Sequence, residues 1–87
     1  MHEASLIAGL MRRINELGRD EGAHQIIGVS VWLGALSHMS PEHFTEHFEQ
    51  AAAGTIAESA QLKIVVSNDT GHDHAQDIIL KSIDVET

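Results

Sequence analysis

Cysteine is absent from the 87-residue sequence, which excludes disulfide bonds and every metal site built on thiolates. Long apolar runs are absent as well, since none approaches the roughly 18 residues that a membrane-spanning helix needs. The chain start has no basic stretch followed by an apolar block, so no signal peptide is expected and the cytoplasm is the expected compartment. A chain of this length is expected to form a single domain, residues 1–87, with a thin core.

Basic residues are also few. Five lysines and arginines stand against thirteen aspartates and glutamates, which gives a net charge of -8. A surface of that sign repels a phosphate backbone, so basic proteins and metal cations are better expected partners than nucleic acid. The sequence also lacks a glycine-rich phosphate loop and a recognisable catalytic triad, so we expect a protein that is not an enzyme.

The hydrophobic pattern predicts two amphipathic helices. Apolar residues three and four positions apart over residues 4–17 predict the first helix, with Gly18 as its C-terminal stop. The second helix is expected to begin at Pro41, after the N-cap Ser40, and to end at Gly54. Two phenylalanines four residues apart would lie on its inner face.

Three segments alternate apolar and other residues and predict strands: residues 27–33, 62–66 and 78–85. The first is expected to place alternate side chains in the core, namely Ile27, Val29, Val31 and Leu33. Trp32 would lie on the opposite face, where it either covers the sheet or marks a docking surface. The predicted fold is therefore α+β, with two helices packed on one face of a small three-stranded sheet.

Histidine is abundant, with seven residues, and it is the commonest metal ligand near neutral pH. The chain begins Met1-His2-Glu3, which puts an imidazole beside the terminal amine. The amine, the amide and ring nitrogens of His2 and the amide nitrogen of Glu3 can form adjoining chelate rings around one ion. A planar, nitrogen-rich ligand set suits Ni(II) or Cu(II) and does not suit magnesium or calcium. His24, at the entry to the first strand, is expected to be structural or to orient this N-terminus.

Four other histidines fall into two pairs with two interpretations each. His43 and His47 lie four residues apart on the second predicted helix, which is the spacing of helical zinc sites and equally that of an ordinary solvated face. His72 and His74 lie in a polar loop, residues 67–76, where they either bind a metal weakly or only form a soluble turn. His38 would add a ligand if its turn lies close to the chain start.

Several short segments follow one another in a recognisable order. They are MHEASLI at residues 1–7, AHQI at 23–26, GALS at 34–37, PEHF at 41–44 with FE at 48–49, GTIAESAQLKI at 54–64 and LKSIDVE at 80–86. In this order they resemble the HypA/HybF family of nickel-handling accessory proteins for the maturation of nickel–iron hydrogenase. The resemblance is collinear and extends over most of the chain.

The resemblance implies a metallochaperone that binds Ni(II) at Met1, His2 and Glu3. Its implied partners are a HypB-type GTPase and the hydrogenase large subunit, which receives the nickel. The alternative is a metal-free adaptor that keeps the same scaffold for protein docking or regulation. Binding of nickel by the untagged protein would separate the two.

The sequence departs from the family pattern between the second and third strands. Family members carry two CxxC pairs there, which form a zinc lobe, whereas this chain has only the loop of residues 67–76 and no cysteine. A structural zinc site needs four ligands, and His72, Asp73 and His74 offer three at most. We therefore expect the zinc lobe to be replaced by a short loop, with no structural zinc.

Overall fold

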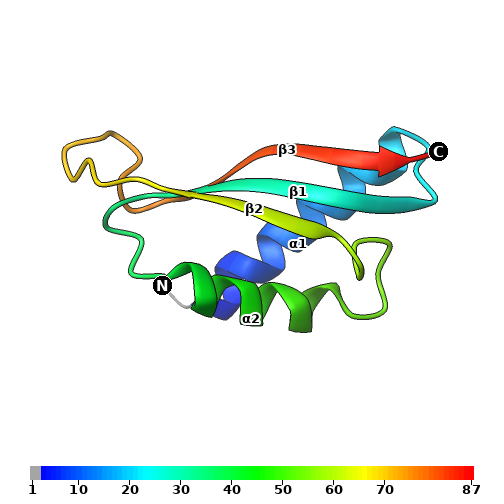
Figure 1. Cartoon of the computed structure of the whole chain (residues 1–87), viewed down its shortest axis with the longest axis horizontal. Coiled ribbons are helices and arrows are strands. Elements are labelled where there is room, and N and C mark those ends of the chain that lie inside the picture. Colours follow the sequence, from blue (N-terminus) through cyan, green and yellow to red (C-terminus); the bar gives the residue numbers. More distant parts are fainter. Residues whose placement is uncertain (1–2) are drawn as a thin grey trace.

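A computed structural model describes residues 3–87 and orders five elements along the chain (Figure 1). They are α1 (Glu3–Asp20), β1 (Gln25–Leu33), α2 (Pro41–Ala52), β2 (Gln61–Val66) and β3 (Ile78–Glu86). The sheet has the order β2-β1-β3, with β2 parallel and β3 antiparallel to β1. This arrangement confirms the α+β fold with the predicted order of elements.

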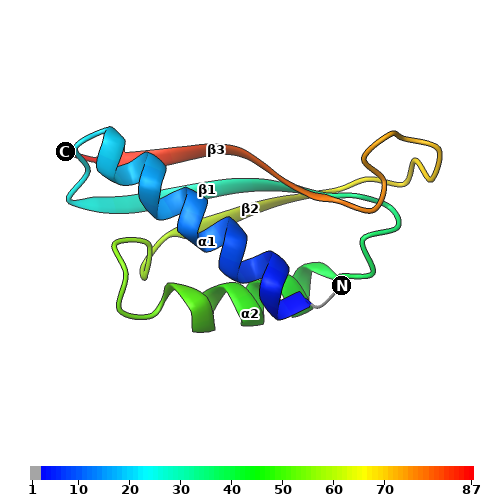
Figure 2. The ribbon, with the colours of Figure 1, turned by 180° about the vertical axis from the view of Figure 1, so that it is seen from behind.

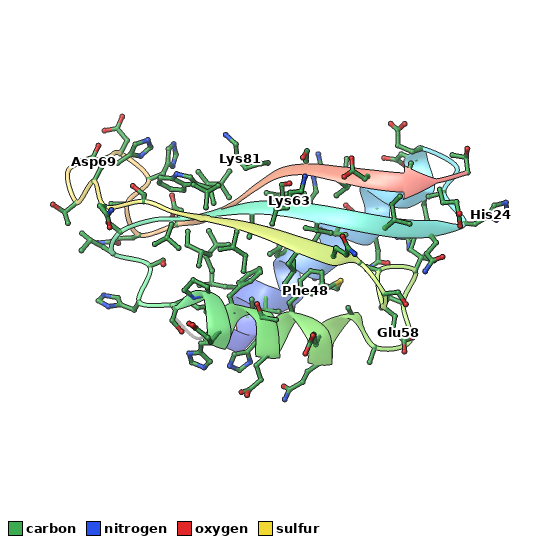
Figure 3. All side chains as sticks on the ribbon, viewed as in Figure 1. His24, Phe48, Glu58, Lys63, Asp69 and Lys81 are labelled. Atoms are coloured by element: carbon green, nitrogen blue, oxygen red, sulfur yellow. The ribbon has the colours of Figure 1, made fainter. Side chains whose placement is uncertain are left out.

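Both helices lie on the same side of the sheet, and α1 runs diagonally beneath it from α2 toward the far end of β3 (Figures 1 and 2). Phe48 points from α2 into the space between this helix and the sheet (Figure 3). The largest fully buried side chains come from the helices and from β1: Phe44, Phe48, Ile14, Ile26, Leu33, Val29 and Val31. The core thus lies between the helix layer and the central strand.

The end of α1 differs from the prediction, because the helix passes through Gly18 and continues to Asp20. The amide of Ala23 donates to the carbonyl of Gly18, and that of Gly22 donates to the carbonyl of Arg19. This is the hydrogen-bond pattern of a Schellman motif, and it needs the left-handed φ of 72° that Gly22 adopts. Gly18 has a packing role instead, since an added Cβ would lie 2.8 Å from the Cδ1 of Ile26.

The core register of β1 also differs at its first position. Ile27 was expected in the core but is 47% exposed, whereas Ile26 is fully buried. The pairing with β3 has an irregularity between Ile26 and Gly28, and such a bulge moves successive side chains to the other face. The alternation of apolar residues along the strand assumes a regular pairing, so it could not reveal that the bulge buries Ile26 and exposes Ile27.

The second helix begins at Pro41 as its sequence predicts and ends at Ala52, two residues before the predicted Gly54. The Oγ atom of Ser40 accepts a hydrogen bond from the amide of His43 at 3.1 Å, and Pro41 occupies the first turn. After the helix, Gly54 turns the chain with a φ of 80°, and the carboxylate of Glu58 accepts from its amide at 3.1 Å. Within residues 3–87, neither helix is long and apolar enough to cross a membrane.

Candidate metal site

The proposed nickel ligands Met1 and His2 lie outside the described residues, and Glu3 opens α1. The first turns of this helix lie against α2. A shallow depression of about 250 Å³ is lined by Ile7 and Ala8 from α1 and by His47, Gln50 and Ala51 from α2. Because Ile7 is about one helical turn after Glu3, the surface of α2 around His47 lies close to the beginning of α1.

His43 and His47 face each other on α2. Their Nε2 atoms lie 2.9 Å apart, and the ring centroids are 4.6 Å apart with the planes tilted by 46°. Both side chains are half-buried, and the residues that directly follow them, Phe44 and Phe48, are buried in the core. Because their nitrogens are in direct contact, His43 and His47 form an interacting pair and not two independent side chains on a solvated face.

His38 and His24 lie apart from this pair and apart from each other. His38 is exposed, with a left-handed φ of 60°, in the segment that leads from β1 into α2, and its participation in a metal site stays a prediction. His24 lies at one end of the long molecular axis, where its amide donates to the carbonyl of Glu86 (Figure 3). The 18 residues of α1 correspond to about 27 Å of helix between Glu3 and the turn before His24, so the exposed His24 imidazole lies too far from the beginning of α1 to orient it.

His72 and His74 order the loop between β2 and β3, at the other end of the molecule (Figure 1). The Nδ1 of His72 accepts a hydrogen bond from the amide of His74 at 2.9 Å, and the Nδ1 of His74 lies 2.9 Å from the carboxylate of Asp77. The His72 ring also packs on Trp32, with centroids 4.9 Å apart. These contacts fit the interpretation as a soluble turn, while metal binding by His72 and His74 stays a prediction.

Trp32 therefore covers the outer face of the sheet beneath the loop. Gly34, two residues after Trp32, directly follows the last residue of β1, and the sequence did not reveal its role. A Cβ added at Gly34 would lie 2.2 Å from the carbonyl oxygen of Ala75, because the loop crosses directly over the chain as it leaves β1. Ala75 itself is 4% exposed, so this crossing is packed without a gap.

The histidines and carboxylates of residues 3–87 form no cluster of three or more side chains that could hold a metal ion. The loop keeps the three candidate side chains His72, Asp73 and His74 exposed, and two of them use a ring nitrogen within the turn. A metal held by the described part of the chain would therefore need ligands from elsewhere, such as water or the chain start.

Two helices on one face of a mixed three-stranded sheet, with imidazoles on α2 and in the loop after β2, define a small two-layer α+β protein with nitrogen ligands at its surface. Residues 1–72 match the family described as hydrogenase/urease nickel incorporation, metallochaperone, HypA. The chain belongs to this HypA family, as the resemblance predicted. The family description names a metallochaperone, a class of protein that carries a metal.

Individual relatives agree with the family. The chain is 38% identical over 65 residues to the hydrogenase maturation factor HypA of Acidithiobacillus ferrooxidans. It is 40% identical over 65 residues to HypA 2 of Bradyrhizobium diazoefficiens. Each match takes in 75% of this chain and 58% of the relative, so the chain spans little more than half the length of these curated proteins.

The fold is also that of solved structures. The solution structure of the Ni metallochaperone HypA from Helicobacter pylori superposes with a TM-score of 0.80 at 22% identity, over 98% of this chain and 97% of that one. A second HypA solution structure gives a TM-score of 0.76 at 23% identity. At these identities the structures establish a common fold.

Proposed function

We propose that this protein is a nickel-binding metallochaperone for the maturation of nickel–iron hydrogenase. The single observation that carries the proposal is the family match over residues 1–72, which includes the Met1-His2-Glu3 start. Ni(II) is the cargo, bound by the terminal amine, by the amide and ring nitrogens of His2 and by the amide nitrogen of Glu3. That nitrogen-rich set suits a tetragonal divalent ion.

The partners follow from the same proposal. Together with a HypB-type GTPase, the protein would deliver the metal to the hydrogenase large subunit, and the transfer would take place in the cytoplasm. The net charge of -8 favours the capture of cations and of basic protein surfaces. We also propose that the protein holds no structural zinc, since it has no cysteine to supply thiolate ligands.

Nickel titration tests the ligand set at the chain start. An N-terminal extension converts the amine to an amide and moves His2 away from the chain end, so the extended protein should bind Ni(II) far more weakly than protein with a free N-terminus. His2→Ala should have the same effect at almost no cost in stability, since substitutions outside cores and caps usually stay within about 0.5 kcal/mol. Equal affinities of the free, extended and His2→Ala proteins in calorimetry would refute this ligand set.

Maturation in cells tests the function itself. Cells carrying His2→Ala should show reduced hydrogenase activity that partly recovers with added nickel. The competing hypothesis, a metal-free adaptor that acts by docking, expects His2→Ala to be silent. Normal maturation at limiting nickel would therefore favour the adaptor and leave only the fold.

A further inference from the structure

The imidazole pair on α2 is a second feature that can bind a metal, separate from the chain start. His43 and His47 occupy successive turns of one helix, with Nε2 atoms 2.9 Å apart. The backbone at His43 is fixed by the N-cap, because its amide donates to the Oγ of Ser40. The next residue, Phe44, is fully buried, which anchors this turn of the helix in the core. A site on such a rigid element is already organised for binding.

The distance between the two nitrogens corresponds to a particular coordination geometry. Imidazole nitrogens lie about 2.0–2.1 Å from a bound divalent ion such as zinc. Two such ligands at right angles are separated by about 2.9 Å, and two at the tetrahedral angle by about 3.3 Å. The observed 2.9 Å is the length of a hydrogen bond between the two rings, and it equals the separation of two adjacent ligands of a square-planar or octahedral ion. An ion of that geometry, such as Ni(II) or Cu(II), could therefore bind with less movement of the rings than a tetrahedral zinc ion.

The chemistry of imidazole also allows the exchange of this hydrogen bond for a metal. A neutral imidazole has one N–H donor and one acceptor nitrogen, so a contact between two such rings holds one hydrogen. When the donor ring shifts its hydrogen from Nε2 to Nδ1, both Nε2 lone pairs become available to one ion. The shift keeps the number of protons constant, so no acid or base is needed.

We propose that His43 and His47 form a second binding site for a tetragonal divalent cation, Ni(II) or Cu(II), with both Nε2 atoms as ligands. The carboxylates of Glu42 and Glu46, exposed on the same helix, raise the local concentration of cations. Two protein ligands leave the remaining positions of the ion to water, so the metal can exchange. His47 also lines the depression that Ile7 forms, one helical turn from the beginning of α1.

This location suits a role in nickel transfer. That role rests on the proposed function, whereas the binding of a metal by His43 and His47 is independent of it. An ion released from the chain start would meet the α2 pair as the next set of nitrogen ligands. The pair would thus hold nickel near the beginning of α1 while the first site is emptied or refilled.

Titrations in a His2→Ala background separate the two sites. Calorimetry should show that His2→Ala protein still binds one Ni(II), and that adding His43→Gln or His47→Gln removes this binding. The loss should be at least the roughly 10–100-fold that removal of an outer-shell partner of a metal ligand costs. His24→Gln is the matched control, because it removes an exposed imidazole at the far end of the molecule (Figure 3) and should change nothing.

A second measurement does not depend on any variant at His43 or His47. In ¹H–¹⁵N spectra of the His2→Ala protein, traces of Cu(II) should broaden the ring signals of His43 and His47 before those of His24. Absence of nickel uptake in the His2→Ala background, or unchanged uptake after His43→Gln, would overturn the α2 site. Tighter binding of zinc than of Ni(II) would overturn its tetragonal geometry. Failure of the chain-start site would appear separately, as equal nickel uptake by the wild-type and His2→Ala proteins.

Discussion

Substitution of Gly34 by alanine tests the crossing of the loop over the end of β1. The new Cβ would lie 2.2 Å from the carbonyl oxygen and 2.5 Å from the carbonyl carbon of Ala75, and both are backbone atoms that cannot swing away. Relief requires the loop to move by roughly an ångström. That movement strains two hydrogen bonds, from the Gly34 amide to the Asp77 carbonyl at 2.9 Å and from the Leu36 amide to the Ala75 carbonyl at 2.7 Å.

The cost can be worked out from these contacts. Overpacking typically destabilises by about 1–3 kcal/mol, and each weakened hydrogen bond contributes up to about 0.5–1.5 kcal/mol to that range. For a domain of this size, 1 kcal/mol lowers Tm by roughly 4–8 °C, so Gly34→Ala should lower Tm by roughly 4–24 °C. The emission of Trp32, the only tryptophan, should also change because its contact with His72 depends on the same loop.

The assay is thermal unfolding followed by circular dichroism, together with Trp32 fluorescence of the folded protein. Gly71→Ala is the matched control in the same loop, because its Cβ would meet only the Asp69 carboxylate at 3.6 Å, an ordinary contact. It should leave Tm and Trp32 emission nearly unchanged. A Gly34→Ala protein with wild-type Tm and wild-type emission would refute the close crossing of loop and strand.

Three further perturbations test the core, the helix cap and the absence of zinc. Phe48→Ala removes a ring that is 1% exposed and should lower the free energy of unfolding in urea by roughly 3–5 kcal/mol. The control Glu49→Ala changes an exposed side chain and should stay within about 0.5 kcal/mol. Equal losses of unfolding free energy in the two variants would contradict the placement of α2. Ser40→Ala removes the acceptor for the His43 amide and should cost about 1 kcal/mol in the same assay, and no cost would mean that the cap does not stabilise α2. A strong chelator should leave Tm nearly unchanged, so a large drop would reveal a structural metal.

The fold could be predicted from the sequence because its elements carry separate local patterns. The stripe of α1, the Ser40-Pro41 start of α2 and the alternation in the strands each define one element with no knowledge of the others. The predictions failed where a contact between elements decides the outcome. Gly18 resembles a helix stop in sequence, but it is the point where α1 packs on Ile26.

The candidate site could be predicted less completely. His43 and His47 have an i,i+4 spacing that is visible in the sequence, but spacing alone does not say whether two rings touch. Contact depends on the rotamers that the first turns of α1 and the body of α2 permit, and these are properties of packing. The proximity of Gly34 to Ala75 is likewise a contact between distant parts of the chain. Its only sequence sign was a glycine directly after a strand.

The topology explains how a short connection can join β2 and β3. Val66, the last residue of β2, and Ile78, the first of β3, both pair with Leu33, so the connection only has to cross the end of β1. Two strand spacings amount to roughly 10 Å, which roughly three to five extended residues can span. The loop of residues 67–77 is longer than this and contributes one buried side chain, that of Ala75, to the described structure. Both pairing registers are fixed by β1 and by the helices beneath it, so an insertion at this crossing can grow or shrink while α1 and α2 keep their places.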